Sequence, residues 1–355
     1  MKALILAAGR FDENLRAAIA AGREPRLDIF ELARKLGADH LDYLDAEASQ
    51  HPVVVATRKA LGASPAVAVL GYLRRHAYDV VLTTGEDIGI PFAALLRTSS
   101  ARCAHTMIAH TLAPRKKQIF FKAGDVARRI DRILAYSSSE ETLMRGKLGI
   151  PASKVQRIYY HADEQFFHPR DTPVEPRLVC AAGQLLRDYD TLVEAVRDRP
   201  IQVQIAAGSP WIERKLEPSR VLPPNVRWGK LNRFDLRELY ARSALAVVPI
   251  LQNEYQTGIA TILEMMAMGK CVIATRTRGQ TDTIVDGETG VYVPPSDPLA
   301  LRATIERLLD APAEAARIGR AARKFVEEHA GLDRFVERLA TAMTESHRAR
   351  DAAAA

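Results

Sequence analysis

The sequence of 355 residues exceeds one ordinary hydrophobic core and favours two domains. No segment reaches the eighteen or so apolar residues of a membrane-spanning helix, and the first apolar run is too short for a signal peptide, so we expect a cytoplasmic protein. Its three isolated cysteines exclude a disulfide framework and a paired-cysteine zinc site, whereas a net charge of +7 is compatible with phosphorylated ligands, anionic lipid or simply a basic surface.

The first half of the chain alternates short apolar runs with helical patterns. Strands are predicted over residues 2–8, 40–44, 79–84, 102–109, 132–137 and 154–160. Helices are predicted over residues 27–36, 66–76, 89–97 and 140–148, the last opened by a capping box at Ser138. This alternation favours a parallel sheet with helices on both faces.

Prolines and charged residues with little periodicity, over residues 161–177, are typical of a domain boundary. Beyond them the alternation repeats. Strands are predicted over residues 178–182, 202–207, 226–229, 245–250, 271–275 and 291–294. Helices are predicted over residues 189–198, 235–243, 257–268, 281–285, 298–309 and, by composition, 313–350. We therefore expect two doubly wound α/β domains, at 1–165 and 178–325, a linker at 166–177, and a helical tail at 326–355 that packs back on the first domain.

The segment at 257–268 reads as a nearly buried helix, because apolar residues cover most of its faces. Gly258 at its start would let backbone N–H groups approach a ligand, and a helix start suits a phosphate. Glu264 is the single carboxylate in this helix. An acid in apolar surroundings needs a partner, and a pair of sugar hydroxyls such as those of a ribose would serve.

This stretch resembles the signature of retaining glycosyltransferases of family 4, which have the GT-B fold of two Rossmann-like domains facing a cleft. The signature has two glutamates separated by seven residues, then Ala-Met-Ala-x-Gly-x-Pro-Val. Here Glu264 is the second glutamate, and residues 266–272 follow in register. Gln256 replaces the first, with Glu254 two residues earlier, so either residue would have the sugar-contacting, catalytic role that the resemblance implies.

The resemblance also implies donor-binding residues elsewhere in the second domain. Arg187, at the end of a strand and before a helix, would form bidentate bonds to a diphosphate; its alternative is a surface ion pair with Asp190 or Glu194. One of two cations expected here is missing, because Gln184 stands at its position. The remaining donor-binding residues that the resemblance implies are Gly183, Lys230, Leu231, Thr257, Gly258 and Ile259.

In the first domain the resemblance is mostly architectural. His110 ends a strand where related enzymes have a histidine that contacts the donor sugar or its phosphate. Glu86 is an acceptor-contacting candidate, although helix capping by its neighbour Asp87 is the alternative. Gly9 and Arg10 follow the first strand, where we expect acceptor recognition.

A basic stretch at 115–132 flanks the pair Phe120 and Phe121. It is compatible with peripheral docking on an anionic inner membrane face; the alternative is a solvated helix face whose two aromatic residues lie in the core. It lacks the aromatic interleaving of a nucleic-acid binder.

The implied activity is transfer of a sugar, with retention of configuration, from a nucleotide-diphosphate donor of UDP or GDP type to an unknown acceptor, which would be a lipid, a glycan or a small molecule. The resemblance implies no cofactor and no metal. Two alternatives stay open: a GT-B-shaped nucleotide-sugar epimerase, and a non-catalytic nucleotide-sugar-binding protein, which Gln184 and Gln256 at expected charged positions would suit.

Overall fold

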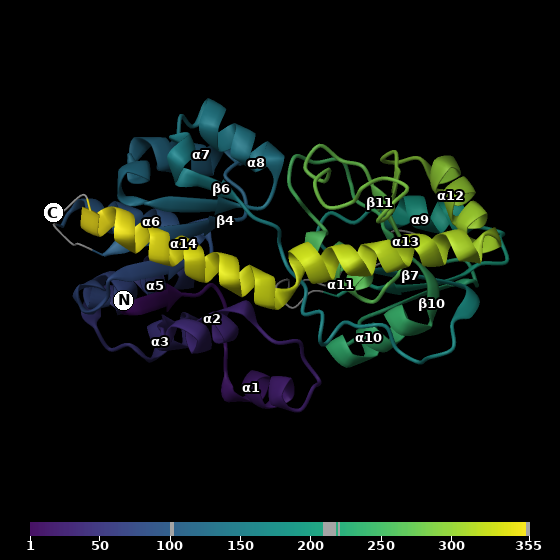
Figure 1. The fold of residues 1–355 in the computed structure, drawn as a ribbon, viewed down its shortest axis with the longest axis horizontal. Helices are drawn as coiled ribbons and strands as arrows, with labels where there is room; N and C mark the ends of the chain where they lie inside the picture. Colours follow the sequence, from purple (N-terminus) through teal and green to yellow (C-terminus); the bar gives the residue numbers. More distant parts are fainter. Residues whose placement is uncertain (100–102, 209–217, 219–220, 353–355) are drawn as a thin grey trace. The chain divides into compact units, whose positions relative to one another are not determined.

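The structure, a computed structural model, describes residues 1–99, 103–208, 218 and 221–352. The chain forms two compact units (Figure 1). Unit 1 comprises Met1–Ala20, Arg26–Ile158 and Asp333–Ala355, and unit 2 comprises Ala21–Pro25 and Tyr159–Leu332. The units therefore divide after residues 158 and 332, where the sequence suggested 165 and 325. Among the described residues, no helix combines the length and the apolar character needed to cross a bilayer.

Unit 1 is built on a parallel sheet whose strand order, in its described part, is β2-β1-β3-β4-β5-β6. The strands are β1 (Ala3–Leu6), β2 (Asp39–Leu41), β3 (Val80–Thr83), β4 (Ala104–Ala109), β5 (Arg132–Ala135) and β6 (Val155–Arg157). Each overlaps a strand predicted from the sequence, and all but β2, which begins one residue before its prediction, lie within the predicted range. Residue 102, where the fourth prediction began, is outside the described residues. β1, β3 and β4 are buried along their whole length, as expected for a sheet covered on both faces.

The described part of unit 1 also contains helices, some of which the sequence predicted and some of which it did not. They are α1 (Glu13–Ala20), α2 (Asp28–Leu36), α3 (Tyr43–Ala48), α4 (Pro52–Leu61), α5 (Ala63–Arg74), α6 (Glu86–Arg97), α7 (Arg115–Ala123), α8 (Ser138–Thr142) and α14 (Leu332–Ala352). The prediction missed α1, α3, α4 and α7. α1 buries no residue and α4 buries only Val54, so neither presents an apolar stripe to read.

The predicted cap of α8 is displaced by one residue. Ser137, not Ser138, is the N-cap, and its hydroxyl accepts a hydrogen bond from the Glu140 amide. The Glu140 carboxylate does not return to the cap, because it accepts hydrogen bonds from the Thr111 hydroxyl and the Leu112 amide.

The last helix, α14, belongs almost entirely to unit 1 (Figure 1). Polar side-chain contacts hold it there. The Thr106 hydroxyl on β4 donates to the Ser346 hydroxyl at 2.9 Å. Arg350 forms an ion pair with Asp131 at 2.7 Å. The tail is therefore a structural part of unit 1, although it follows unit 2 in the chain.

Unit 2 repeats the architecture, with the strand order β12-β11-β10-β7-β8-β9 in the described part of its sheet. The strands are β7 (Glu175–Ala182), β8 (Gln202–Ala206), β9 (Val226–Gly229), β10 (Ser243–Val248), β11 (Val272–Thr275) and β12 (Val291–Val293). The helices are α9 (Tyr189–Val196), α10 (Arg233–Arg242), α11 (Ile259–Ala267), α12 (Pro298–Asp310) and α13 (Pro312–Phe325). All pairings are parallel, so the carboxyl ends of the strands share one edge.

The helix predicted at 281–285 is wrong, because this segment is irregular. The Val285 amide donates to the Thr289 hydroxyl at 2.9 Å, and the Glu288 amide donates to the Val285 carbonyl. The loop thus closes on itself, and Ile284 packs into the core without a helix, whereas Val285 is exposed.

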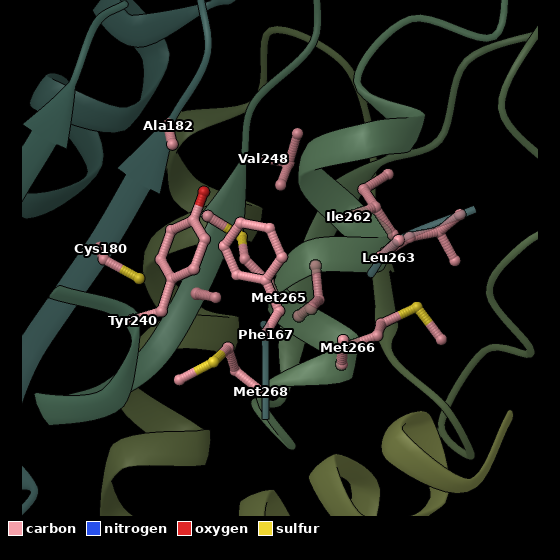
Figure 2. Packing of buried hydrophobic residues seen from close by; sticks show 14 of the residues in the cluster. Phe167, Cys180, Ala182, Tyr240, Val248, Ile262, Leu263, Met265, Met266 and Met268 are labelled. Carbon is pink, nitrogen blue, oxygen red and sulfur yellow. The ribbon is translucent and has the colours of Figure 1, made fainter. Parts of the chain in front are cut away.

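The core of unit 2 lies on both faces of its sheet. Cys180, Ala182 and Val248 point to the face covered by α10 and α11, and the alternate residues point to the other. Figure 2 shows the rings of Phe167 and Tyr240 beside Met265 of α11; the ring centroids are 6.2 Å apart. This core packs directly beneath the carboxyl ends of β7 and β10, where the candidate site lies.

The contact between α13 and the end of α11 requires glycine. A Cβ on Gly319 would lie 2.1 Å from the Gly269 carbonyl oxygen, which is backbone and cannot swing away. We expect Gly319→Ala to lower the free energy of unfolding by about 1–3 kcal/mol, the usual cost of overpacking. Urea unfolding would measure this loss. The control is Gly146→Ala, because a Cβ there meets no atom within 4 Å; equal stability of the two variants would contradict the prediction.

Candidate functional site

Arg187 lies at the carboxyl edge of the sheet in unit 2, in a turn that two left-handed residues create. Gly183 after β7 has φ +97° and Leu186 has φ +51°. A Cβ on Gly183 would lie 2.3 Å from Nη2 of Arg187, so the guanidinium occupies the space that the missing side chain leaves. Glycine is therefore required at 183 both by the backbone angle and by the approach of the arginine.

The Arg187 guanidinium is held from three sides. Nε donates to the Ala182 carbonyl at 3.0 Å, Nη1 to the Leu185 carbonyl at 2.8 Å, and Nη2 to the Thr261 hydroxyl of α11 at 3.1 Å. Burial lowers its pKa, although an arginine remains charged at neutral pH. The surface ion pair that the sequence allowed is not formed.

The start of α11 faces this arginine. Gly258 is the N-cap residue, with φ +82° and no side chain to cap the first turn. A Cβ there would meet Ile250, Val248 and Nη1 of Arg187 at 3.1–3.3 Å. The helix is buried from Thr261 to Ala267, as predicted. Its first N–H groups and the guanidinium together form a positive edge.

Glu264 lies one turn after Thr261 and is 8% exposed. Its partner is not visible in the local sequence: Nη1 of Arg233, the first residue of α10, donates to Oε1 at 2.8 Å. The Tyr240 hydroxyl donates to Oε2 over a longer 3.5 Å. Burial raises the pKa of Glu264, and Arg233 opposes this rise. The lone acid of α11 is therefore the anion of a buried ion pair.

A second carboxylate reaches this pair from the amino-terminal part of the chain. The segment Ala21–Pro25 groups with unit 2. Burial raises the pKa of Glu24, the charge of Arg233 opposes that rise, and the charge of Glu264 adds to it. Sequence reasoning assigned no role to Glu24 or Arg233, since each is distant in the chain from Glu264.

The two residues proposed for the position of the first motif acid have different surroundings. Glu254 is exposed and forms an ion pair with Arg278 at 2.9 Å. Gln256 points inward: its Nε2 donates to the Thr283 hydroxyl at 3.5 Å, and its Oε1 is buried without a hydrogen-bond partner among the described residues. Both amide atoms of the fully buried Gln280 are also without a partner within the described part of the chain.

The other predicted donor residues surround the same edge. Thr257 is buried, and its hydroxyl accepts from the Asn253 amide at 3.1 Å. Lys230 is exposed after β9, and Leu231 is half-buried against the core. Gln184 follows Gly183 in the Arg187 turn, and Ile259 begins α11. Unit 2 thus brings the ends of β7, β9 and β10 and the start of α11 to one side of the sheet.

In unit 1, buried carboxylates fix the loop after β4. Glu86, at the start of α6, accepts from the His110 amide at 2.8 Å and from Lys117 of α7 at 2.5 Å. The exposed His110 ring has Nε2 2.9 Å from the Thr84 carbonyl. A carbonyl only accepts, so Nε2 carries the proton and a neutral ring keeps Nδ1 as its acceptor.

The alternative role of Asp87 is wrong: Gly85 is the N-cap of α6, and Asp87 is exposed and paired with Lys117 at 3.2 Å. Of the predicted acceptor residues, Gly9 is buried, and a Cβ there would lie 2.6 Å from the Phe11 ring. Arg10 is exposed and paired with Glu47 at 2.5 Å. Glu86, by contrast, is buried beneath the His110 loop.

No group of three or more metal-ligating side chains occurs in the described ranges.

Sequence comparison identifies relatives of this chain. The model of the family glycosyl transferases group 1 matches residues 178–311. The MMP alpha-(1->4)-mannosyltransferase of Mycolicibacterium hassiacum is 27% identical over 55% of this chain and 49% of its own length. A D-inositol 3-phosphate glycosyltransferase of Nocardiopsis dassonvillei is 25% identical over 71% of this chain and 64% of its own. The chain thus spans about half to two thirds of these relatives.

Solved structures share the fold over nearly the whole chain. The sucrose-phosphate synthase of Thermosynechococcus elongatus aligns with a TM-score of 0.71 at 19% identity, covering 99% of this chain and 100% of that one. HepE of Anabaena, in complex with UDP and glucose, aligns with a TM-score of 0.70 at 14% identity, covering 97% and 99%. The chain accordingly has the GT-B fold, and its residues 178–311 are similar to the glycosyl transferases group 1 family.

Proposed function

We propose that this protein transfers a sugar from a nucleotide-diphosphate donor to an acceptor, with retention of configuration. The observation that carries the proposal is the position of the Arg187 guanidinium, between Gly183 and Gly258 and beside the first turn of α11. A planar cation and unpaired N–H groups that face the same space are suited to a diphosphate.

Glu264 supports a nucleotide donor, because its carboxylate lies one helical turn beyond Thr261, which holds Arg187. A diphosphate on Arg187 would place the attached ribose near this acid, whose oxygens accept hydrogen bonds from hydroxyls. The backbone at Lys230 and Leu231 would contact the base. The structure of HepE with UDP-glucose favours a UDP-type donor here, with GDP as the alternative.

The sugar would lie near Gln256. Its buried Oε1 has no partner within the described residues, and an unmade buried hydrogen bond costs about 1–3 kcal/mol, so a sugar hydroxyl is a favourable partner. Glu254 is a weaker candidate for contacting the sugar, because it already forms an ion pair with Arg278 at the surface. His110, whose exposed ring is on unit 1, remains a predicted catalytic residue.

During transfer, negative charge develops on the leaving diphosphate. Arg187 and the N–H groups at the start of α11 would stabilise this charge, because both are fixed before the reaction begins. The chemistry requires no cofactor beyond the nucleotide sugar itself. The acceptor would be recognised by unit 1 residues, among which Arg10 is the exposed candidate.

The first test is a panel of UDP- and GDP-sugars read by thermal shift, followed by turnover with the donor that binds. A donor at 100 times its Kd should stabilise the wild type by about 2.7 kcal/mol. Arg187→Lys keeps the charge but loses the fork geometry, and we expect turnover to fall by about 10²–10³.

The matched control is Arg197→Lys, because Arg197 makes only a half-exposed ion pair with Glu194 at 3.0 Å on the same unit. Donor binding without turnover across a broad acceptor panel would favour the non-catalytic alternative. Full turnover in the Arg187 variant would remove the diphosphate role.

We also propose that α7 associates with anionic membrane surfaces. Phe121 is 2% exposed and belongs to the core, whereas Ile119 and Phe120 are 64% and 58% exposed. Arg115 and Lys122 lie on the same short helix. Exposed apolar side chains beside basic ones suit the interface of an anionic bilayer.

Liposome sedimentation tests this association. The wild type should pellet with phosphatidylglycerol vesicles and much less with phosphatidylcholine vesicles or at high salt, because the charge term is screened. Ile119→Ser/Phe120→Ser should abolish pelleting without loss of stability, whereas Val53→Ser/Leu61→Ser, which removes exposed apolar residues from α4, should not. Equal pelleting of all three proteins would contradict the proposal.

A further inference from the structure

Arg233 is a charged residue of the candidate site to which the resemblance assigns no role. We propose that Arg233 is a positioning residue that keeps Glu264 ionised and aimed at the ribose of the donor, and that offsets the charge of Glu264 beside the diphosphate. This inference rests on the proposed donor site in unit 2.

The geometry is that of a fixed pair. Asn232 caps α10, and Arg233 is the first residue of that helix. Tyr240 lies seven residues later, which is two helical turns and therefore the same face. Each of the two contacts a different oxygen of Glu264, at 2.8 Å for Arg233 and 3.5 Å for Tyr240. One helix thus fixes both carboxylate oxygens, and each oxygen keeps a lone pair for a hydroxyl.

Arg233 is also the cation that most directly preserves the charge of Glu264. Burial raises the pKa of this acid, and Arg233 is the largest opposing influence, followed by Tyr240 and the more distant Arg187. Glu24 faces the pair from the segment Ala21–Pro25 and acts in the opposite direction.

The elements packed against α11 on its other sides offer little compensation. β10 and β11 present apolar residues, and α13 places Arg323 on the Ala267 carbonyl at the far end of the helix.

Ionisation of Glu264 decides how a ribose can be bound. An ionised carboxylate accepts hydrogen bonds from both the 2′ and 3′ hydroxyls, whereas a protonated one loses part of that capacity. Charge-assisted hydrogen bonds are also about twice as strong as neutral ones. An uncompensated carboxylate would, however, repel the neighbouring diphosphate. Arg233 meets both requirements, and its side chain is 25% exposed.

The experiment measures the affinity for UDP and GDP by calorimetry between pH 6 and 8.5. In the wild type we expect a change of less than about twofold, because Arg233 favours the ionised form of Glu264. In Arg233→Met the pKa of Glu264 rises further, so binding should be weaker at every pH and fall by up to about tenfold per pH unit toward pH 6. Arg233→Gln keeps an N–H donor without the charge, and we expect the same pH dependence from it.

Stability provides a second measurement. Because the pKa of folded Glu264 lies above its unfolded value, its contribution is present at acid pH and lost as the pH rises through the folded pKa. The Arg233 variants raise that folded pKa, so their melting temperature should drop more between pH 5 and 8 than that of the wild type. Adding Glu264→Gln to either variant should remove both pH dependences.

Arg242→Met is the matched control, because Arg242 is on the same helix and pairs with Glu175 at 2.7 Å away from Glu264. It should bind with the wild-type pH profile. Profiles of Arg233→Met or Arg233→Gln that run parallel to the wild type overturn the role of Arg233, while wild-type binding itself upholds the donor site. A wild type that binds neither nucleotide overturns the proposed function and the inference together.

Discussion

A carboxylate inside an apolar helix is the constraint on which the arrangement of unit 2 depends. An isolated buried charge costs far more than one hydrogen bond returns, so Glu264 can stay ionised in α11 only if a cation is brought to it. α10 provides that cation at its first residue and a tyrosine two turns later. Both helices pack on the same face of the sheet, and the ion pair links them. Arg233 therefore shapes the site before any ligand is present.

The charged group at the carboxyl edge of the sheet, the Arg187 guanidinium, is also held in a fixed position. The position of Arg187 depends on the space left by Gly183 and on the left-handed turn formed by Gly183 and Leu186. It also depends on the hydrogen bond to the Thr261 hydroxyl of α11. Thr261 and Glu264 are three residues apart and lie on one face of α11, so one helix holds the cation and carries the acid. The buried helix α11 thereby holds Arg187 at one turn and carries the Glu264 carboxylate on the next. Such pre-organisation is what binding and transition-state stabilisation both require.

The sequence predicted the sheets well, because each central strand is a continuous apolar run bounded by turn residues. It also placed Glu264 and Arg187 on the correct elements. It could not find Arg233, which is an ordinary surface arginine by pattern and meets Glu264 only through the fold. It also could not distinguish the exposed Phe120 from the buried Phe121. Both lie on α7, which was not predicted as a helix and which directs the first side chain to solvent and the second into the core. Local pattern reveals burial along one element, whereas pairing between elements depends on tertiary packing.

The departures from the family pattern are themselves informative when taken together. Gln184 stands where a cation is expected, and Gln256 stands where an acid is expected. The first change removes one positive charge and the second removes one negative charge, so their effects on the field at a bound diphosphate oppose each other. Arg233 balances the charge of Glu264, so Arg187 is the cation that the proposed diphosphate would meet.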